Sequence, residues 1–149
     1  MELKRVVVTG IGAVSPLGNS AAETWQKLLD GVSGAAPITH FDATEFKTQF
    51  ACELKGFKAE DFIDRKEARK MDPYCHYAMA AASMAMDDSA IDLEAIDKNR
   101  VGVVFGVGIG GMKTFEDEIT NYALHKDTLG PKFNPFFVPK MIADICAGQ

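Results

Sequence analysis

Apolar runs alternate with amphipathic stretches along the chain, a pattern that predicts an α/β protein. Residues 5 to 9 include three consecutive valines and are followed by Gly10 and Gly12, which is typical of a strand buried on both faces of a parallel sheet. Residues 101 to 105 have the same character and run into a second glycine-rich segment. We therefore expect strands at residues 4 to 9 and 101 to 105, with helices layered against the sheet.

Helical signals follow each of these runs. Ser20 and Glu23 form a capping box, in which the Ser20 hydroxyl accepts from the amide three residues on and Glu23 reaches back to the Ser20 amide. This helix should end near Asp30, because Gly31 supplies a left-handed stop. Three further helices are predicted, with a polar turn at Gly130 and Pro131 before the last: residues 73 to 88, residues 114 to 125 capped by Thr114, and a helix beginning at Pro139.

The helix predicted over residues 73 to 88 is the candidate core element. Asp72 suits its N-cap, and Pro73 suits the first helical position, where a missing amide donor costs nothing. Residues 78 to 86 are apolar nearly all round, which indicates burial. Residues 31 to 58 show no sustained period, and we expect a loop there with one short strand near residues 48 to 54.

Composition places the chain among ordinary globular domains. Of 149 residues, 47% are apolar and 25% charged, and the net charge of −5 argues against a general nucleic-acid binder. No stretch approaches the roughly 20 consecutive apolar residues that cross a bilayer. The chain stops at Gln149 inside a helical pattern and has few strands for a doubly wound sheet. We therefore expect an N-terminal piece of a larger α/β protein.

The cysteines and histidines give no sign of a metal site or a catalytic set. Cys52, Cys75 and Cys146 are odd in number and widely spaced, which predicts reduced thiols without structural zinc, each a small hydrophobe rather than a nucleophile. The histidines also stand apart in the sequence, which favours structural or surface roles. They are His40, His76 and His125.

Residues 106 to 111 form a G-x-G-x-x-G motif after a predicted strand and before a predicted helix, formally a dinucleotide fingerprint. The motif lies about 100 residues into the chain, and no second strand ending in an acidic residue follows, both unusual for a dinucleotide fold. A weaker version at residues 10 to 15 has Ser15 in place of the third glycine. Positive φ or close backbone packing explains these glycines better than phosphate binding. A nucleotide-binding oxidoreductase is kept as an alternative.

The segment from Arg65 to Lys70 concentrates positive charge. It carries four cations and one anion, a net +3 in a chain of net −5. On a helix, Lys66, Arg69 and Lys70 would share one face, which can bind an acidic partner or a phosphate. The competing interpretation is a solvated face partly paired with the neighbouring acids, which are Asp61, Asp64 and Glu67.

The order of these motifs resembles that of the β-ketoacyl-acyl-carrier-protein synthases, most closely the synthase II group of bacterial fatty acid synthesis. The resemblance covers essentially the whole chain. Its elements are residues 5 to 12, the turn at residues 15 to 19, Trp25, Phe41 and Asp42, residues 65 to 72, the glycine loop at 106 to 111, and the Pro-Phe-Phe-Val-Pro run at 135 to 139.

The resemblance implies a thiolase-like α/β fold of two similar halves in α-β-α-β-α layers, with this chain as most of the N-terminal half. In that family a cysteine at a helix start takes an acyl group from a carrier thioester. Two histidines then support decarboxylation of malonyl-carrier and attack of the resulting carbanion. The resemblance implies no metal, nucleotide or other cofactor, and a cytoplasmic homodimer.

The same resemblance implies that the nucleophile's motif and both histidines lie beyond Gln149, so that this chain contains no catalytic residue and should be inactive alone. A non-catalytic partner subunit of the same fold is the second alternative. Residue by residue, Lys66, Arg69 and Lys70 match the family's contacts for the acidic acyl carrier protein. Ile109 matches a position lining the fatty-acyl pocket, and Phe137 matches one that reaches the partner subunit's pocket.

Overall fold

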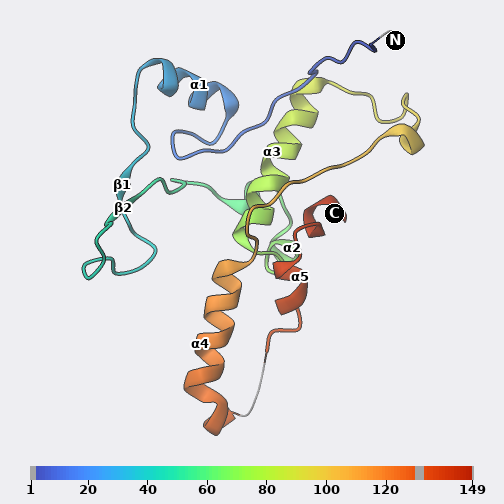
Figure 1. Ribbon diagram of the computed structural model, residues 1–149. Coiled ribbons are helices and arrows are strands. Elements are labelled where there is room, and N and C mark those ends of the chain that lie inside the picture. The colour runs from blue at the N-terminus through green and yellow to red at the C-terminus, as the bar shows by residue number, and fades with distance from the viewer. Residues whose placement is uncertain (1–2, 130–132, 149) are drawn as a thin grey trace. The chain divides into compact units, whose positions relative to one another are not determined.

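The computed structural model describes residues 3 to 129 and 133 to 148, and the predicted turn at Gly130 and Pro131 lies outside them (Figure 1). The chain forms two compact units. The first combines Met1–Lys58 with Ala80–Ile91, and the second combines Ala59–Met79 with Asp92–Gln149. Each unit is described separately below.

The first unit contains helix α1, Ala21–Leu29, which begins as its sequence predicts. The Ser20 hydroxyl accepts a hydrogen bond from the Glu23 amide at 3.1 Å. The Glu23 carboxylate reaches one residue further back than a capping box requires, because it accepts from the Asn19 amide at 3.0 Å instead of from the Ser20 amide. Gly31 follows the helix with φ +67°, the predicted left-handed stop.

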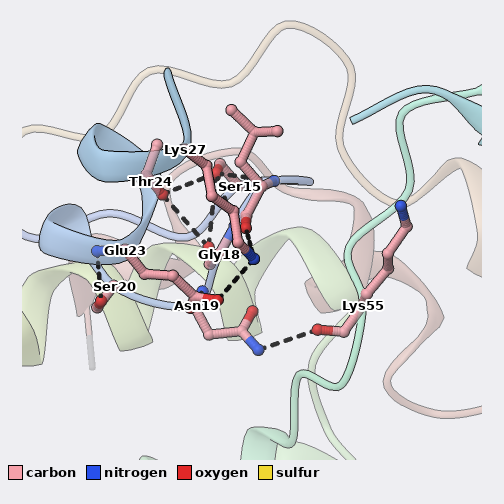
Figure 2. Close-up of polar contacts among 9 residues, drawn as sticks. Ser15, Gly18, Asn19, Ser20, Glu23, Thr24, Lys27 and Lys55 are labelled. Carbon is pink, nitrogen blue, oxygen red and sulfur yellow. Dashed lines mark hydrogen bonds and ion pairs between the residues drawn. The ribbon is translucent and has the colours of Figure 1, made fainter. Parts of the chain in front are cut away.

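A tight turn before α1 is fastened to the helix by polar contacts (Figure 2). Ser15 and Gly18 exchange two backbone hydrogen bonds of 2.8 and 3.1 Å. The Ser15 hydroxyl also lies 2.8 Å from the Thr24 hydroxyl, and Lys27 donates to the Leu17 carbonyl at 2.5 Å. The turn and the helix therefore satisfy one another's polar groups.

Helix α3, Pro73–Ser89, begins at the predicted proline, and its C-terminal part belongs to the first unit. The segment around Gly10 and Gly12 lies directly against this part of the helix. A Cβ atom on Gly10 would lie 2.1 Å from the Ala85 carbonyl oxygen, and one on Gly12 would lie 1.9 Å from that of Ala81. Glycine is required here because any side chain would overlap the helix backbone.

The predicted burial of α3 is only partly confirmed. Of residues 78 to 86, Ala80 is fully buried, whereas Met86 is 42% exposed and most of the others are half-buried. An all-apolar helix needs neighbours on every side to be buried all round, and the described residues cover it only in part.

The two predicted strands of a parallel sheet are wrong as strands in this structure. Residues 4 to 9 and 101 to 105 have no hydrogen-bonded strand partner among the described residues, and Val6 and Val104 are 89% and 93% exposed. A buried parallel strand needs a neighbour on its edges and helices over its faces. The β-branched pattern is therefore present in the sequence without the partners that would bury it.

The sheet that the structure does contain, within the described residues, is small and antiparallel. Strand β1, Ala36–Pro37, pairs with β2, Phe50–Ala51, and Ala36 lies opposite Ala51. Strand β2 falls within the strand predicted near residues 48 to 54, which is confirmed. Strand β1 has no signal in the sequence, because two residues are too few to show a period.

The second unit contains a small core and several short helices. Met71, Cys75 and Cys146 are buried together, with five partly buried side chains packed around them. The elements of this unit, besides the start of α3, are η1 (Ala59–Asp61), α2 (Arg65–Ala68), η2 (Lys98–Arg100), α4 (Met112–Leu129), α5 (Phe137–Met141) and η3 (Ile145–Gly148). Helices α4 and α5 start two residues before their predicted positions and pack against each other.

Asp72 joins the start of α3 to the start of α4. Its side chain is buried, and it accepts hydrogen bonds from the Thr114 amide at 3.2 Å and the Thr114 hydroxyl at 2.7 Å. Thr114 was expected to cap its own helix. Because α4 begins at Met112, Thr114 instead lies in the first turn, and Asp72 supplies the acceptor for its amide.

Replacing Asp72 with alanine should lower the free energy of unfolding by about 2 kcal/mol, because two buried donors of Thr114 lose their acceptor. Urea unfolding of the intact protein measures this. Asp127→Ala removes the same charge from an exposed site on α4 and should change the midpoint little. Equal midpoints for the two variants would contradict the assignment.

Candidate functional site

The basic cluster, Arg65, Lys66, Arg69 and Lys70, is built on the single turn of α2 and the residues after it. The Asp64 side chain caps the helix by accepting from the Lys66 amide at 2.8 Å. The turn continues beyond the helix, because the Lys70 amide donates to the Glu67 carbonyl at 2.9 Å. The expected helical face is therefore only one turn long.

Three cations of this cluster lack counter-ions among the residues that the structure describes. Lys70 pairs with Glu67 at 2.6 Å, so the interpretation of a self-paired face holds for this residue. Arg65, Lys66 and Arg69 are exposed, and none of them makes an ion pair with any residue that the structure describes. Three positive charges are consequently available to a partner of opposite charge.

A hollow of about 420 Å³ opens beside α2. Its lining includes two side chains that the sequence analysis did not connect with the basic cluster, His76 from α3 and Lys140 from α5. The His76 Nε2 lies 2.8 Å from the Ala68 carbonyl oxygen, so Nε2 carries the proton and donates. A lone cation at position 140 carries no signal in the sequence, since only the fold brings it to α2.

The glycine loop at residues 106 to 111 packs against its own unit at its end, whereas Gly106 and Gly108 have open space where a Cβ would lie. A Cβ on Gly110 would lie 2.9 Å from the Tyr74 ring, and one on Gly111 would lie 2.7 Å from the Met141 Cα. Gly111 also has φ +70°. Close packing therefore explains Gly110 and Gly111, and positive φ also applies at Gly111, whereas neither explanation applies at Gly106 or Gly108.

Ile109 and Phe137, the residues matched to the acyl pocket, have different surroundings. Ile109 is 76% exposed, so the described residues do not enclose its side chain. Phe137 is half-buried at the start of α5 and stacks on Phe115 of α4, with ring centroids 6.2 Å apart. The ring centroid of Phe133 lies 5.8 Å from that of Phe137. Phe137 thus helps to join α4 and α5, and the structure does not bring Ile109 into this aromatic group.

Two of the cysteines are poor nucleophiles. Cys75 and Cys146 are buried in the core of the second unit, as predicted, whereas Cys52 is exposed. Burial, reinforced by the neighbouring Cys75 thiol, raises the pKa of Cys146 to about 12. Its reactive thiolate is therefore scarce at neutral pH.

The described residues contain no group of three or more His, Cys, Asp or Glu side chains placed to hold a metal ion. Among those same residues, no helix has the length and hydropathy that spanning a membrane demands.

The chain matches the model of a known protein family, the β-ketoacyl synthase N-terminal domain, over residues 3–149. Curated relatives agree with it. The 3-oxoacyl-[acyl-carrier-protein] synthase 2 of Synechocystis sp. is 44% identical over 149 residues, covering 99% of this chain and 35% of the relative. The enzyme of the same name from Staphylococcus aureus (strain COL) is 46% identical, covering 98% of this chain and 34% of the relative. The chain thus spans about a third of the length of these relatives.

Solved structures share the fold. A chain from the complex of a type II polyketide synthase acyl-carrier protein with its ketosynthase superposes with a TM-score of 0.76 at 29% identity, over 98% of this chain and 38% of that one. A β-ketoacyl synthase from Burkholderia phymatum gives a TM-score of 0.72 at 26% identity, over 98% of this chain and 36% of that one. These similarities confirm the predicted thiolase-like α/β fold class.

Proposed function

Because this chain belongs to the β-ketoacyl synthase family, we propose that the protein is a β-ketoacyl-acyl-carrier-protein synthase, an acyltransferase of fatty acid elongation. The observation that carries the proposal is the 44% to 46% identity, along essentially the whole chain, to enzymes named 3-oxoacyl-[acyl-carrier-protein] synthase 2. Residues 1 to 149 would form the N-terminal part of its condensing-enzyme domain.

In the proposed reaction a cysteine thiolate attacks an acyl-carrier thioester, forms an acyl-enzyme and releases the carrier thiolate, which takes up a proton from solvent. Malonyl-carrier then loses CO₂, and the resulting carbanion attacks the acyl-enzyme carbonyl. The product is a 3-oxoacyl-carrier two carbons longer, and the enzyme thiolate is regenerated. Each step conserves charge and needs no redox partner, so the reaction has no use for a nicotinamide cofactor.

We place the nucleophile and both catalytic histidines outside residues 1 to 149. The raised pKa of Cys146 supports this, because an acyl acceptor needs a lowered thiol pKa. The histidines of this chain also have other partners: the Nε2 of His76 donates to a carbonyl, the Nδ1 of His125 lies 3.0 Å from the Asn121 carbonyl oxygen, and the Nε2 of His40 lies 3.9 Å from the Glu53 carboxylate. The contribution of these residues is therefore recognition and scaffolding.

The proposed partner is an acidic acyl carrier protein that docks on the basic cluster. The free cations of Lys66 and Arg69 support this, and a related ketosynthase has been solved in complex with its acyl-carrier protein. Lys70 would join after exchanging Glu67 for a carrier carboxylate. The three free cysteines fit a reducing cytoplasm, and the family resemblance leads us to propose a homodimer.

The nucleotide-binding alternative is not supported by the glycine loops. In the first loop, the Ile11 amide donates to Asp88 at 2.8 Å, and the flanking glycines pack on α3. In the second, Gly110 and Gly111 pack on Tyr74 and α5. These close contacts account for Gly10, Gly12, Gly110 and Gly111 without a bound pyrophosphate, whereas Gly106 and Gly108 make no such contact.

The direct test of the proposed function is condensation by the intact protein. Acyl-carrier and ¹³C-labelled malonyl-carrier should yield labelled CO₂ and a 3-oxoacyl-carrier longer by two carbons, resolved by mass spectrometry. Carrier binding without product would instead indicate a non-catalytic partner subunit. Saturable NADPH binding without condensation would indicate the oxidoreductase.

We propose that Ile109 and Phe137 line the acyl pocket of the intact protein. The variant Ile109→Phe should then shorten the longest accepted acyl chain by about two to four carbons, because the added ring fills volume that the chain would occupy. Activity on short chains should persist. Leu124→Phe is the control, since Leu124 is similarly exposed on α4. A chain-length profile identical to that of the control would refute the assignment of Ile109.

A further inference from the structure

The hollow beside α2 concentrates uncompensated positive charge from two separate elements. Arg65 and Arg69 come from the basic cluster, and Lys140 comes from α5. None of these three side chains makes an ion pair or a hydrogen bond that the structure records among its described residues. Glu60 is the single carboxylate among the lining residues. The hollow therefore carries a net positive charge.

The apolar part of the lining strengthens the attraction between these cations and an anion. Ala68 and Met71 line it and are themselves buried, with exposed fractions of 8% and 6%. Apolar walls lower the local dielectric, so a cation here attracts an anion more strongly than the same cation on an open surface. His76 fixes one wall, because its ring bonds to the Ala68 carbonyl.

Arg69 lines the hollow and, like Lys66, is also an exposed cation of the basic cluster. A partner bound by Lys66 and Arg69 therefore has other groups of its own surface over the hollow. We propose that the hollow is an anion subsite of the docking surface, where Lys140 and Arg65 receive a carboxylate side chain of the acidic carrier protein. The inference rests on the proposed function and adds Lys140, from a different part of the chain, to the residues that recognise the carrier.

The test is carrier affinity measured on the intact protein at low salt. Lys140→Glu should weaken binding about 5- to 10-fold, since it removes one attraction and introduces one repulsion inside the hollow. Lys98→Glu is the matched control: it makes the same charge change at an exposed lysine of the same unit. It should weaken binding less than 2-fold. Equal effects of the two reversals would overturn the subsite.

Three further measurements separate the remaining explanations. Lys140→Met keeps the aliphatic part of the side chain and should still weaken binding about 3-fold. This variant tests the proposal even if Lys140→Glu does not fold. A carrier with a surface acid changed to lysine should recover affinity for Lys140→Glu, and failure of every such carrier variant would refute a carboxylate ligand. If inorganic phosphate binds only the unmutated hollow and carrier affinity is unchanged, the site takes small anions, which also overturns the proposal.

The proposed function can be judged apart from this subsite. If Lys66→Glu with Arg69→Glu weakens carrier binding but Lys140→Glu does not, the subsite is wrong and the docking surface stands. If none of these variants changes affinity while condensation persists, the function stands and the carrier docks elsewhere.

Discussion

Reversing two of the three unpaired cations of the basic cluster, with Lys66→Glu and Arg69→Glu together, should weaken carrier binding by about 10- to 100-fold at low salt. Both side chains are exposed and have no ion pair within the described residues. Reversing their charges therefore breaks no ion pair inside the protein and changes only the interaction with the carrier. The acidic carrier loses two attractions and meets two repulsions. Calorimetric titration of the intact protein with carrier measures the change.

Salt provides the internal check on this result. Exposed charges are screened within about 8 Å at physiological ionic strength, so the difference between variant and unmutated protein should shrink as salt rises. Lys66→Glu with Lys98→Glu gives an equal net charge with only one reversal inside the cluster. It should fall between the double variant and the unmutated protein. Unchanged affinity of the Lys66 and Arg69 variant at low salt would remove the docking assignment.

A methyl group at position 12 should be among the most destabilising single changes in the first unit. In Gly12→Ala the new Cβ would lie 1.9 Å from the Ala81 carbonyl oxygen and 2.7 Å from the Ala85 amide nitrogen. Both are helix backbone atoms, so no side chain can rotate away, and the segment must separate from α3. We expect a loss of about 3 kcal/mol or more in the free energy of unfolding.

The matched control for this change is Gly102→Ala. Gly102 has open space within 4 Å of its would-be Cβ and no positive φ, and alanine restricts the unfolded chain slightly more than glycine does. Its unfolding midpoint in urea should therefore stay level or rise a little. Similar losses for both alanine variants would show that the contact between residues 10 to 12 and α3 contributes little to stability.

Local signals in the sequence were sufficient for the two ends of α1 and for the start of α3. The Ser20 cap, the Gly31 stop and the Pro73 start all lie where the sequence predicts them, because each depends on the backbone of adjacent residues. Contacts between distant residues were beyond such reasoning. The Asp72 side chain bonds to Thr114 only because the fold brings two helix starts together.

The predictions of strands at residues 4 to 9 and 101 to 105 were wrong because strands depend on distant residues. Valine-rich runs indicate which segments can be buried in a sheet, but burial depends on neighbours that the local pattern does not contain. Val6 and Val104 are accordingly exposed in a chain that spans about a third of its curated relatives' length. The same distinction applies to the candidate site. The cations at residues 65 to 70 could be predicted from the sequence because they are neighbours in it, whereas the position of Lys140 beside them depends on the fold.

The position of the carrier on the intact protein can be measured directly by photo-crosslinking. A photoreactive amino acid would replace Lys66 in one sample and Lys98 in another, and each would be illuminated with acyl carrier protein. We expect covalent capture of the carrier from position 66, suppressed by excess unlabelled carrier, and little capture from position 98. Capture from position 98 alone, or from both positions equally, would contradict the central claim that the basic cluster is where the carrier binds.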